Sequence, residues 1–135
     1  MAWRNWLPRL VLAAAVLLYL MIGAKFVLDP DGAATQSGLR MAAAVGRTNV
    51  RAGLGGFPLG IAATLAFCLV APARTVAGLR LAAGITGAVL AVRLAGAAAD
   101  GALIESARLL APETLVVALS LLAARAARRS QAQAL

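Results

Sequence analysis

The 135-residue sequence contains no histidine and a single cysteine, Cys68. Without histidine the chain cannot supply a histidine ligand to haem, a zinc site of the usual Cys/His type, or the base of a Cys/His or Ser/His nucleophilic pair. One cysteine cannot form an internal disulfide. Because Cys68 lies in the apolar run 65–71, we expect it to be a small packing residue. We therefore predict no metal site, no cofactor and no catalytic residue.

Acidic and aromatic residues are also scarce. Five acids accompany 13 basic residues, which gives a formal net charge of +8, and aromatic residues make up 4% of the chain. Nucleic-acid binding would favour basic runs or basic residues interleaved with aromatics. Here the basic residues cluster at the ends of apolar segments, as the topology signals of membrane proteins do. We therefore predict membrane lipids, and no nucleic acid, as partners.

Apolar residues dominate the remainder of the sequence. The chain is 62% hydrophobic with a mean hydropathy of +0.88, whereas soluble domains are roughly 45–50% apolar. Four apolar runs approach the ~20 residues that a spanning helix needs. They predict an all-α integral membrane four-helix bundle, a single domain over residues 1–135 with spans at about 9–28, 51–71, 75–97 and 112–128. Short interfacial helices are expected in the first loop, at 38–46, and in the third loop, at 102–110.

The first apolar run follows a basic start, which is also the pattern of a signal peptide. The run from Leu10 to Leu28 is longer than the ~7–15 apolar residues of a signal peptide, and Ile22 occupies a position where cleavage after Ala24 requires a small residue. We therefore expect this run to be retained as the first span.

The charges that flank the spans predict the orientation. Four spans place both termini on one side, which holds seven basic residues and no acid, while the other side holds six basic residues and all five acids. The terminal-side cations lie in short flanks and loops, which are the positions that the positive-inside rule counts. The expected localisation is the cell inner membrane, multi-pass, with cytoplasmic N- and C-termini.

Six polar residues are predicted to gather at the non-cytoplasmic ends of the helices: Asp29, Asn49, Arg51, Arg93, Asp100 and Glu113. An arginine at the bilayer centre costs ~2.5–3.5 kcal/mol on the insertion scale, so we expect Arg51 and Arg93 to pair with acids. Asp100 and Glu113 are the first candidate partners and Asp29 is the third. Two interpretations remain open: the pairs lock the helix ends, or they line a polar pocket that binds an anionic or polar headgroup.

The second span contains several glycines. Gly55, Gly56 and Gly60 are predicted to allow close helix packing, because Gly56 and Gly60 have the small-xxx-small spacing of helix contacts in lipid. Pro58 lies between them and should bend the helix.

The chain resembles a family of small bacterial membrane proteins catalogued as domain of unknown function 4345. The resemblance covers nearly the whole chain and rests on Asn49-Val50-Arg51-Ala52 with Gly55 to Gly60, Asp29-Pro30, Arg93 before Asp100-Gly101, and Pro112-Glu113. It implies a four-helix membrane protein with no assigned activity. The chain departs from the family pattern at Gly53 and Ala118, where that pattern has acids.

Three classes of function are compatible with these observations. The first is a membrane protein that binds a lipid-like or quinone-like hydrophobic small molecule, or serves as an accessory subunit, through the charged residues; it would act alone, as a homo-oligomer or with a membrane partner. The second is a small transporter, although the run from Leu10 to Leu28 lacks the acid that four-helix multidrug exporters have there. The third is an intramembrane enzyme with Asp100 or Glu113 as general acid or base. The binding function is favoured over an enzyme.

Overall fold

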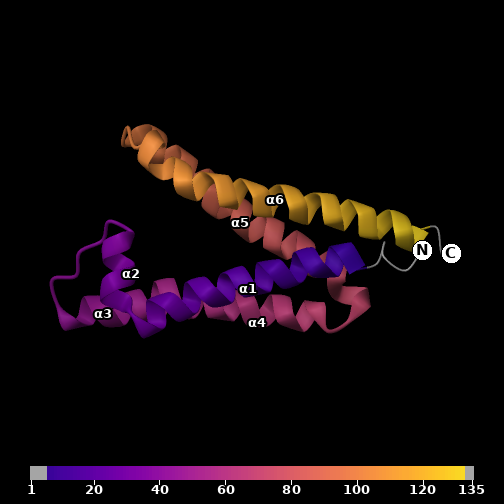
Figure 1. Cartoon of the computed structure of the whole chain (residues 1–135), viewed down its shortest axis with the longest axis horizontal. Helices are drawn as coiled ribbons and strands as arrows, with labels where there is room; N and C mark the ends of the chain where they lie inside the picture. Colours follow the sequence, from indigo (N-terminus) through magenta and orange to yellow (C-terminus); the bar gives the residue numbers. More distant parts are fainter. Residues whose placement is uncertain (1–5, 133–135) are drawn as a thin grey trace. The chain divides into compact units, whose positions relative to one another are not determined.

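The computed structural model describes residues 6–132 as helices joined by turns and, between residues 36 and 44, by a loop (Figure 1). Four stretches are long and apolar enough to cross a membrane: Trp6–Leu28, Ala44–Leu69, Pro72–Ala99 and Leu103–Arg129. The described residues contain no strand. The predicted all-α class with four long apolar helices is therefore confirmed.

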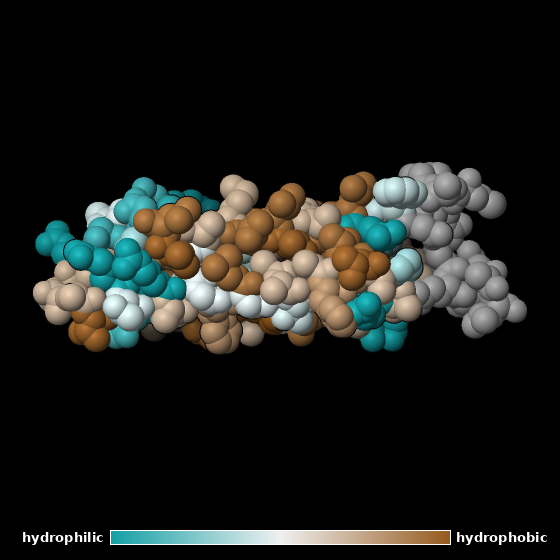
Figure 2. Space-filling model, turned by 90° about the horizontal axis from the view of Figure 1, so that it is seen from below, coloured by the Kyte–Doolittle hydropathy of each residue, from teal (hydrophilic) through white to brown (hydrophobic). Residues whose placement is uncertain are grey.

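The four stretches expose apolar side chains along their lengths. In each of them, at most 22% of the most apolar window is buried, and Figure 2 shows hydrophobic residues over much of the visible face. Large side chains such as Met21, Val92 and Leu122 are exposed. A surface of this kind would aggregate in water, whereas lipid tails solvate it in a bilayer. The protein is thus built as a multi-pass membrane protein.

The chain divides into two compact units. The first unit comprises residues 1–13 and 68–135, and the second comprises residues 14–67. Helix α1 (Trp6–Leu28) begins in the first unit and ends in the second, and helix α4 (Phe57–Leu69) runs in the opposite sense between them.

The second unit contains most of α1, then α2 (Pro30–Gln36), α3 (Ala44–Val50), the π-helix η2 (Arg51–Gly56) and most of α4. Its central contact joins α1 to η2 through two glycines. A Cβ added at Gly23 would lie 2.8 Å from the Gly55 carbonyl oxygen, and a Cβ added at Gly55 would lie 2.6 Å from Val27 Cγ2. Only glycine permits such an approach of one backbone to the other.

The π-helix η2 has a local cause in the sequence. Pro58 has no N–H to donate to the carbonyl of Leu54, and three of the six residues of η2 are glycines, which are poor α-helix formers. The Phe57 N–H instead bonds to the carbonyl of Ala52, five residues earlier. The helix therefore continues from Ala44 to Leu69 through one wider turn.

The first unit is built on a hairpin of α5 (Thr75–Ala99) and α6 (Leu103–Ala132), which lie side by side (Figure 1). Helix α5 ends in a Schellman motif: Gly101 has a φ of 67°, and the Ala102 N–H donates to the Ala97 carbonyl at 2.8 Å. Because the turn is this short, the chain returns directly along α5.

The other end of the first unit is closed by the start of α1 and the end of α4. A Cβ added at Gly78 of α5 would lie 2.6 Å from Cys68 Cβ and 2.9 Å from Leu12 Cδ2. Arg9 Nη2 donates to the Leu69 carbonyl at 3.2 Å. Cys68 is buried in this contact, in agreement with its expected role as a small packing residue.

The connections between the long helices differ from the prediction. In the first loop the separate short helix is α2 at Pro30–Gln36, because Asp29 caps this helix and Pro30 begins it. The separate helix predicted at 38–46 is wrong, because the helix there starts at Ala44 and continues into the second span. In the third loop, 103–110 is no separate helix but the start of α6, with Pro112 inside it. Proline removes one intrahelical hydrogen bond, and water can hydrate the freed carbonyl where a helix is exposed at the membrane surface.

Candidate functional site

Two of the six predicted polar residues, Arg93 and Glu113, meet across the α5–α6 hairpin. Arg93 Nε donates to Glu113 Oε1 and Oε2 at 2.9 and 3.0 Å, and Arg93 Nη2 lies 2.8 Å from Oε1. The side chains are 33% and 17% exposed, respectively. The two charges compensate each other at short range in a half-buried position. The contacts use Nε and Nη2, so the two N–H groups of Nη1 lie outside this pair.

Arg93 also lines an open apolar groove on α5. The groove has a volume of about 430 Å³ and is lined by Ala88, Val89, Val92 and Arg93. Because helical residues rise by about 1.5 Å each, these residues span a turn and a half, with Arg93 nearest the Gly101 turn. The groove therefore has apolar walls and one polar end.

Asp100, the other acid expected to pair with Arg93, is not its ion-pair partner. Asp100 lies at the C-cap of α5 and is exposed, and its backbone N–H donates to the Gly96 carbonyl. It lies seven positions after Arg93, about 10 Å along the helix axis. Glu113 reaches Arg93 because the Schellman turn brings α6 back beside α5.

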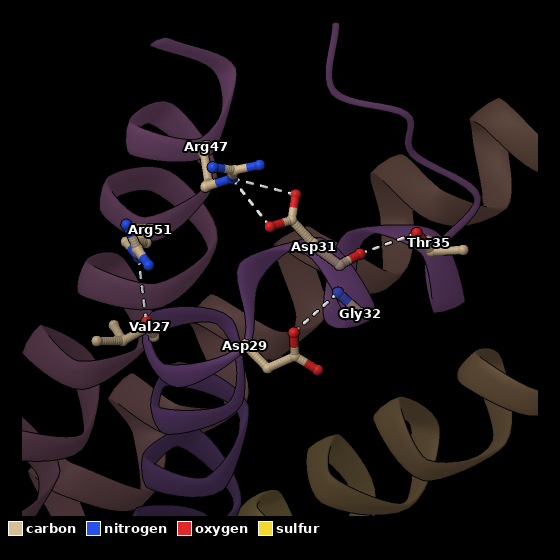
Figure 3. Close-up of polar contacts among 7 residues, drawn as sticks. All are labelled: Val27, Asp29, Asp31, Gly32, Thr35, Arg47 and Arg51. Carbon is tan, nitrogen blue, oxygen red and sulfur yellow. Dashed lines mark hydrogen bonds and ion pairs between the residues drawn. The ribbon is translucent and has the colours of Figure 1, made fainter. Parts of the chain in front are cut away.

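The remaining predicted polar residues belong to the second unit, where Asp29 and Arg51 lie around the end of α1 (Figure 3). Arg51 Nε donates to the Val27 carbonyl at 3.2 Å, and this contact is exposed. Asp29 Oδ1 accepts from the Gly32 N–H at 3.0 Å and so caps α2. Asn49 is exposed on α3. Arg51 thus satisfies one carbonyl of the last turn of α1, where a helix leaves its carbonyls without partners.

Two contacts of this region involve residues outside the predicted set. Arg47 Nε lies 2.9 Å from Asp31 Oδ2 and donates to Asp31 Oδ1 at 3.2 Å, with both side chains more than half exposed. Lys25 Nζ donates to Gln36 Oε1 at 2.7 Å. The available signal was Asp29-Pro30-Asp31, which has the residue order of a helix N-terminus and would have placed Asp31 in a first turn.

The expected pairing of both arginines with acids therefore holds for Arg93 only. Among the residues that the structure describes, no carboxylate forms an ion pair with Arg51. The prediction of an acidic partner for Arg51 is wrong because the candidate Asp29 caps α2 and the end of α1 offers a carbonyl instead. The six residues form two groups, one in each unit.

The glycines predicted for helix packing differ in their contacts. Gly55 makes the close contact with α1, as expected for its type. A Cβ at Gly56 would meet only the Arg51 carbonyl oxygen, at 3.8 Å, and a Cβ at Gly60 would meet nothing within 4 Å. Within the described residues, the small-xxx-small pair Gly56 and Gly60 is thus not the helix contact, and the partner of Gly55 is Gly23.

No protein-family model matches the chain, and comparisons with curated proteins and with solved structures give no match. The resemblance to domain of unknown function 4345 stays a prediction.

Proposed function

We propose that the protein is a small membrane protein that binds a hydrophobic small molecule with an uncharged polar head, quinone-like or lipid-like, in the groove along α5. Membership of the bacterial family that it resembles, a location in the inner membrane and cytoplasmic termini are part of this proposal. The positive-inside pattern supports the orientation.

The observation that carries the proposal is the position of the Arg93–Glu113 pair beside an apolar groove. Ligand sites are mostly apolar, have volumes of about 300–1,000 Å³, and contain a few polar groups that fix orientation. The groove on α5 is open, and its apolar walls with one polar end have this composition.

The ion pair also supports a choice of head group. Glu113 compensates the charge of Arg93, so an anionic ligand would compete with this carboxylate or be repelled by it. An uncharged acceptor, such as a quinone carbonyl, can accept a hydrogen bond from the Arg93 Nη1 donors, which the ion pair does not use. The pair therefore favours a neutral acceptor at the polar end of the groove.

The test is native mass spectrometry of the purified full-length protein, with a search for a co-purifying hydrophobic molecule, followed by titration with decylubiquinone. Ala88→Phe places a ring in the groove and should abolish the bound species. Ala91→Phe is the matched control, because Ala91 is exposed on the same helix and does not line the groove. A bound species that both variants retain equally would refute the groove as its site.

A further inference from the structure

A second group of charges, around the end of α1, has a different electrostatic balance. Arg47 and Arg51 lie there with Asp29 and Asp31 (Figure 3). Lys25 belongs to the last turn of α1 and donates to Gln36 of α2. Asp31 compensates Arg47, and the carboxylate of Asp29 is engaged by the Gly32 N–H. Arg51 contacts only a neutral carbonyl among the contacts that the structure describes for it. This group therefore retains positive charge, unlike the Arg93–Glu113 pair.

Arg47 and Arg51 present their guanidinium groups from adjacent turns of one helix. The Arg51 backbone N–H donates to the Arg47 carbonyl, so the residues are one turn apart, and side chains at this spacing are about 5–6 Å apart at Cβ. Each guanidinium uses Nε for its contact within the chain. Nη1 and Nη2 of both arginines lie outside these contacts, and this edge of a guanidinium can bind phosphate bidentately.

The surroundings of Arg51 match those of a lipid phosphate. Helix α1 has 23 residues, or about 35 Å, slightly more than the ~30 Å hydrocarbon layer, so its end lies near the level of the headgroups. In the helix that contains Arg51, Leu54 follows three residues later in η2 and Phe57 follows six residues later at the start of α4, and both are exposed. A phosphate on Arg51 would thus have its acyl chains beside these apolar side chains.

We propose that Arg51, with Arg47, forms a binding site for the phosphate group of an anionic phospholipid at the end of α1. The guanidinium edges bind the phosphate, and Leu54 and Phe57 contact the acyl chains. The hydrophilic surface over α2 and α3 in Figure 2 is the surface on which the headgroup would lie. The site shares no residue with the groove on α5 and does not depend on its ligand.

The experiment measures competition between phosphatidylglycerol and phosphatidylcholine for the purified full-length protein. The protein in detergent is mixed with equal amounts of both lipids, and native mass spectrometry gives the ratio of the two adducts. We expect an excess of phosphatidylglycerol for the unmodified protein. Arg51→Gln should lower this ratio about tenfold, since a charge-assisted hydrogen bond is worth about 1.5–3 kcal/mol and 1.4 kcal/mol is a factor of ten. Glutamine keeps an N–H donor for the Val27 carbonyl, so the end of α1 remains capped.

Two further variants keep the proposal falsifiable. Arg40→Gln removes the same charge from an exposed residue between α2 and α3 and should leave the ratio unchanged. Asp31→Asn removes the acid that compensates Arg47 and should raise the ratio, a gain that unfolding cannot produce. Equal losses in Arg40→Gln and Arg51→Gln would mean a diffuse charge effect and would overturn the proposal. Displacement of the adduct by inorganic phosphate at millimolar concentration would overturn the lipid assignment in favour of free phosphate.

Discussion

Removing either member of the Arg93–Glu113 pair should destabilise the hairpin of α5 and α6 by about 1–3 kcal/mol. Exposed ion pairs contribute about 0–1 kcal/mol, and breaking a fully buried pair costs about 3–5 kcal/mol because the other charge stays buried without a partner. Here the side chains are 33% and 17% exposed and the shortest N–O distance is 2.8 Å. The expected loss therefore lies between those limits.

The measurement is a double-mutant cycle of Arg93→Met, Glu113→Gln and the double variant, followed by equilibrium unfolding in mixed detergent and SDS micelles. The double variant leaves no unpaired charge, so it should lose about 1–2 kcal/mol less than the sum of the single variants. Arg80→Met is the control, because Arg80 is exposed on the same helix, and its effect should stay within about 0.5 kcal/mol. Single variants that unfold like the control, or strictly additive losses, would show that the pair does not stabilise the hairpin.

Two further expectations concern helix packing and orientation. Gly55→Ala should lower the free energy of unfolding by about 1–3 kcal/mol, because its Cβ would overlap Val27. The Cβ of Gly60→Ala meets nothing within 4 Å, so this variant should raise the free energy of unfolding by about 0.5–1 kcal/mol through helix propensity. Equal effects of the two variants in thermal unfolding would contradict the Gly23–Gly55 contact. With cytoplasmic termini, a C-terminal fluorescent protein fusion should fluoresce and a C-terminal alkaline phosphatase fusion should be inactive, and the reverse pair of results would invert the orientation.

The ion pairs show why part of the candidate site was predictable. The cost of a charge in lipid depends on the residue and its depth, so the sequence predicts that Arg93 needs an acid. Three acids were candidates, and the choice of Glu113 depends on how far α6 returns along α5 after Gly101. For Arg51 the partner was not predictable, because a helix end offers backbone carbonyls as well as side chains. Every residue has a backbone carbonyl, so the sequence does not indicate which one accepts a hydrogen bond.

The packing glycines have a similar explanation. Glycines at 53, 55, 56 and 60 predict a close helix contact somewhere on this segment. Successive α-helical residues are rotated by about 100°, and a π turn changes this phase. In the structure Gly55 faces α1, and Gly56 and Gly60 do not. Spacing alone, counted on a regular α-helix, selected the wrong pair.

The sequence by itself determined that the long helices suit a lipid environment, how many there are, and that the fold is all-α. Hydrophobic length and residue composition are properties of each segment alone. The structure decided which side chains meet: Arg93 with Glu113, Arg51 with the Val27 carbonyl, and Gly55 with Gly23. These contacts depend on the rotation and register of one helix against another. Such quantities arise only when two segments pack, so neither segment's sequence contains them.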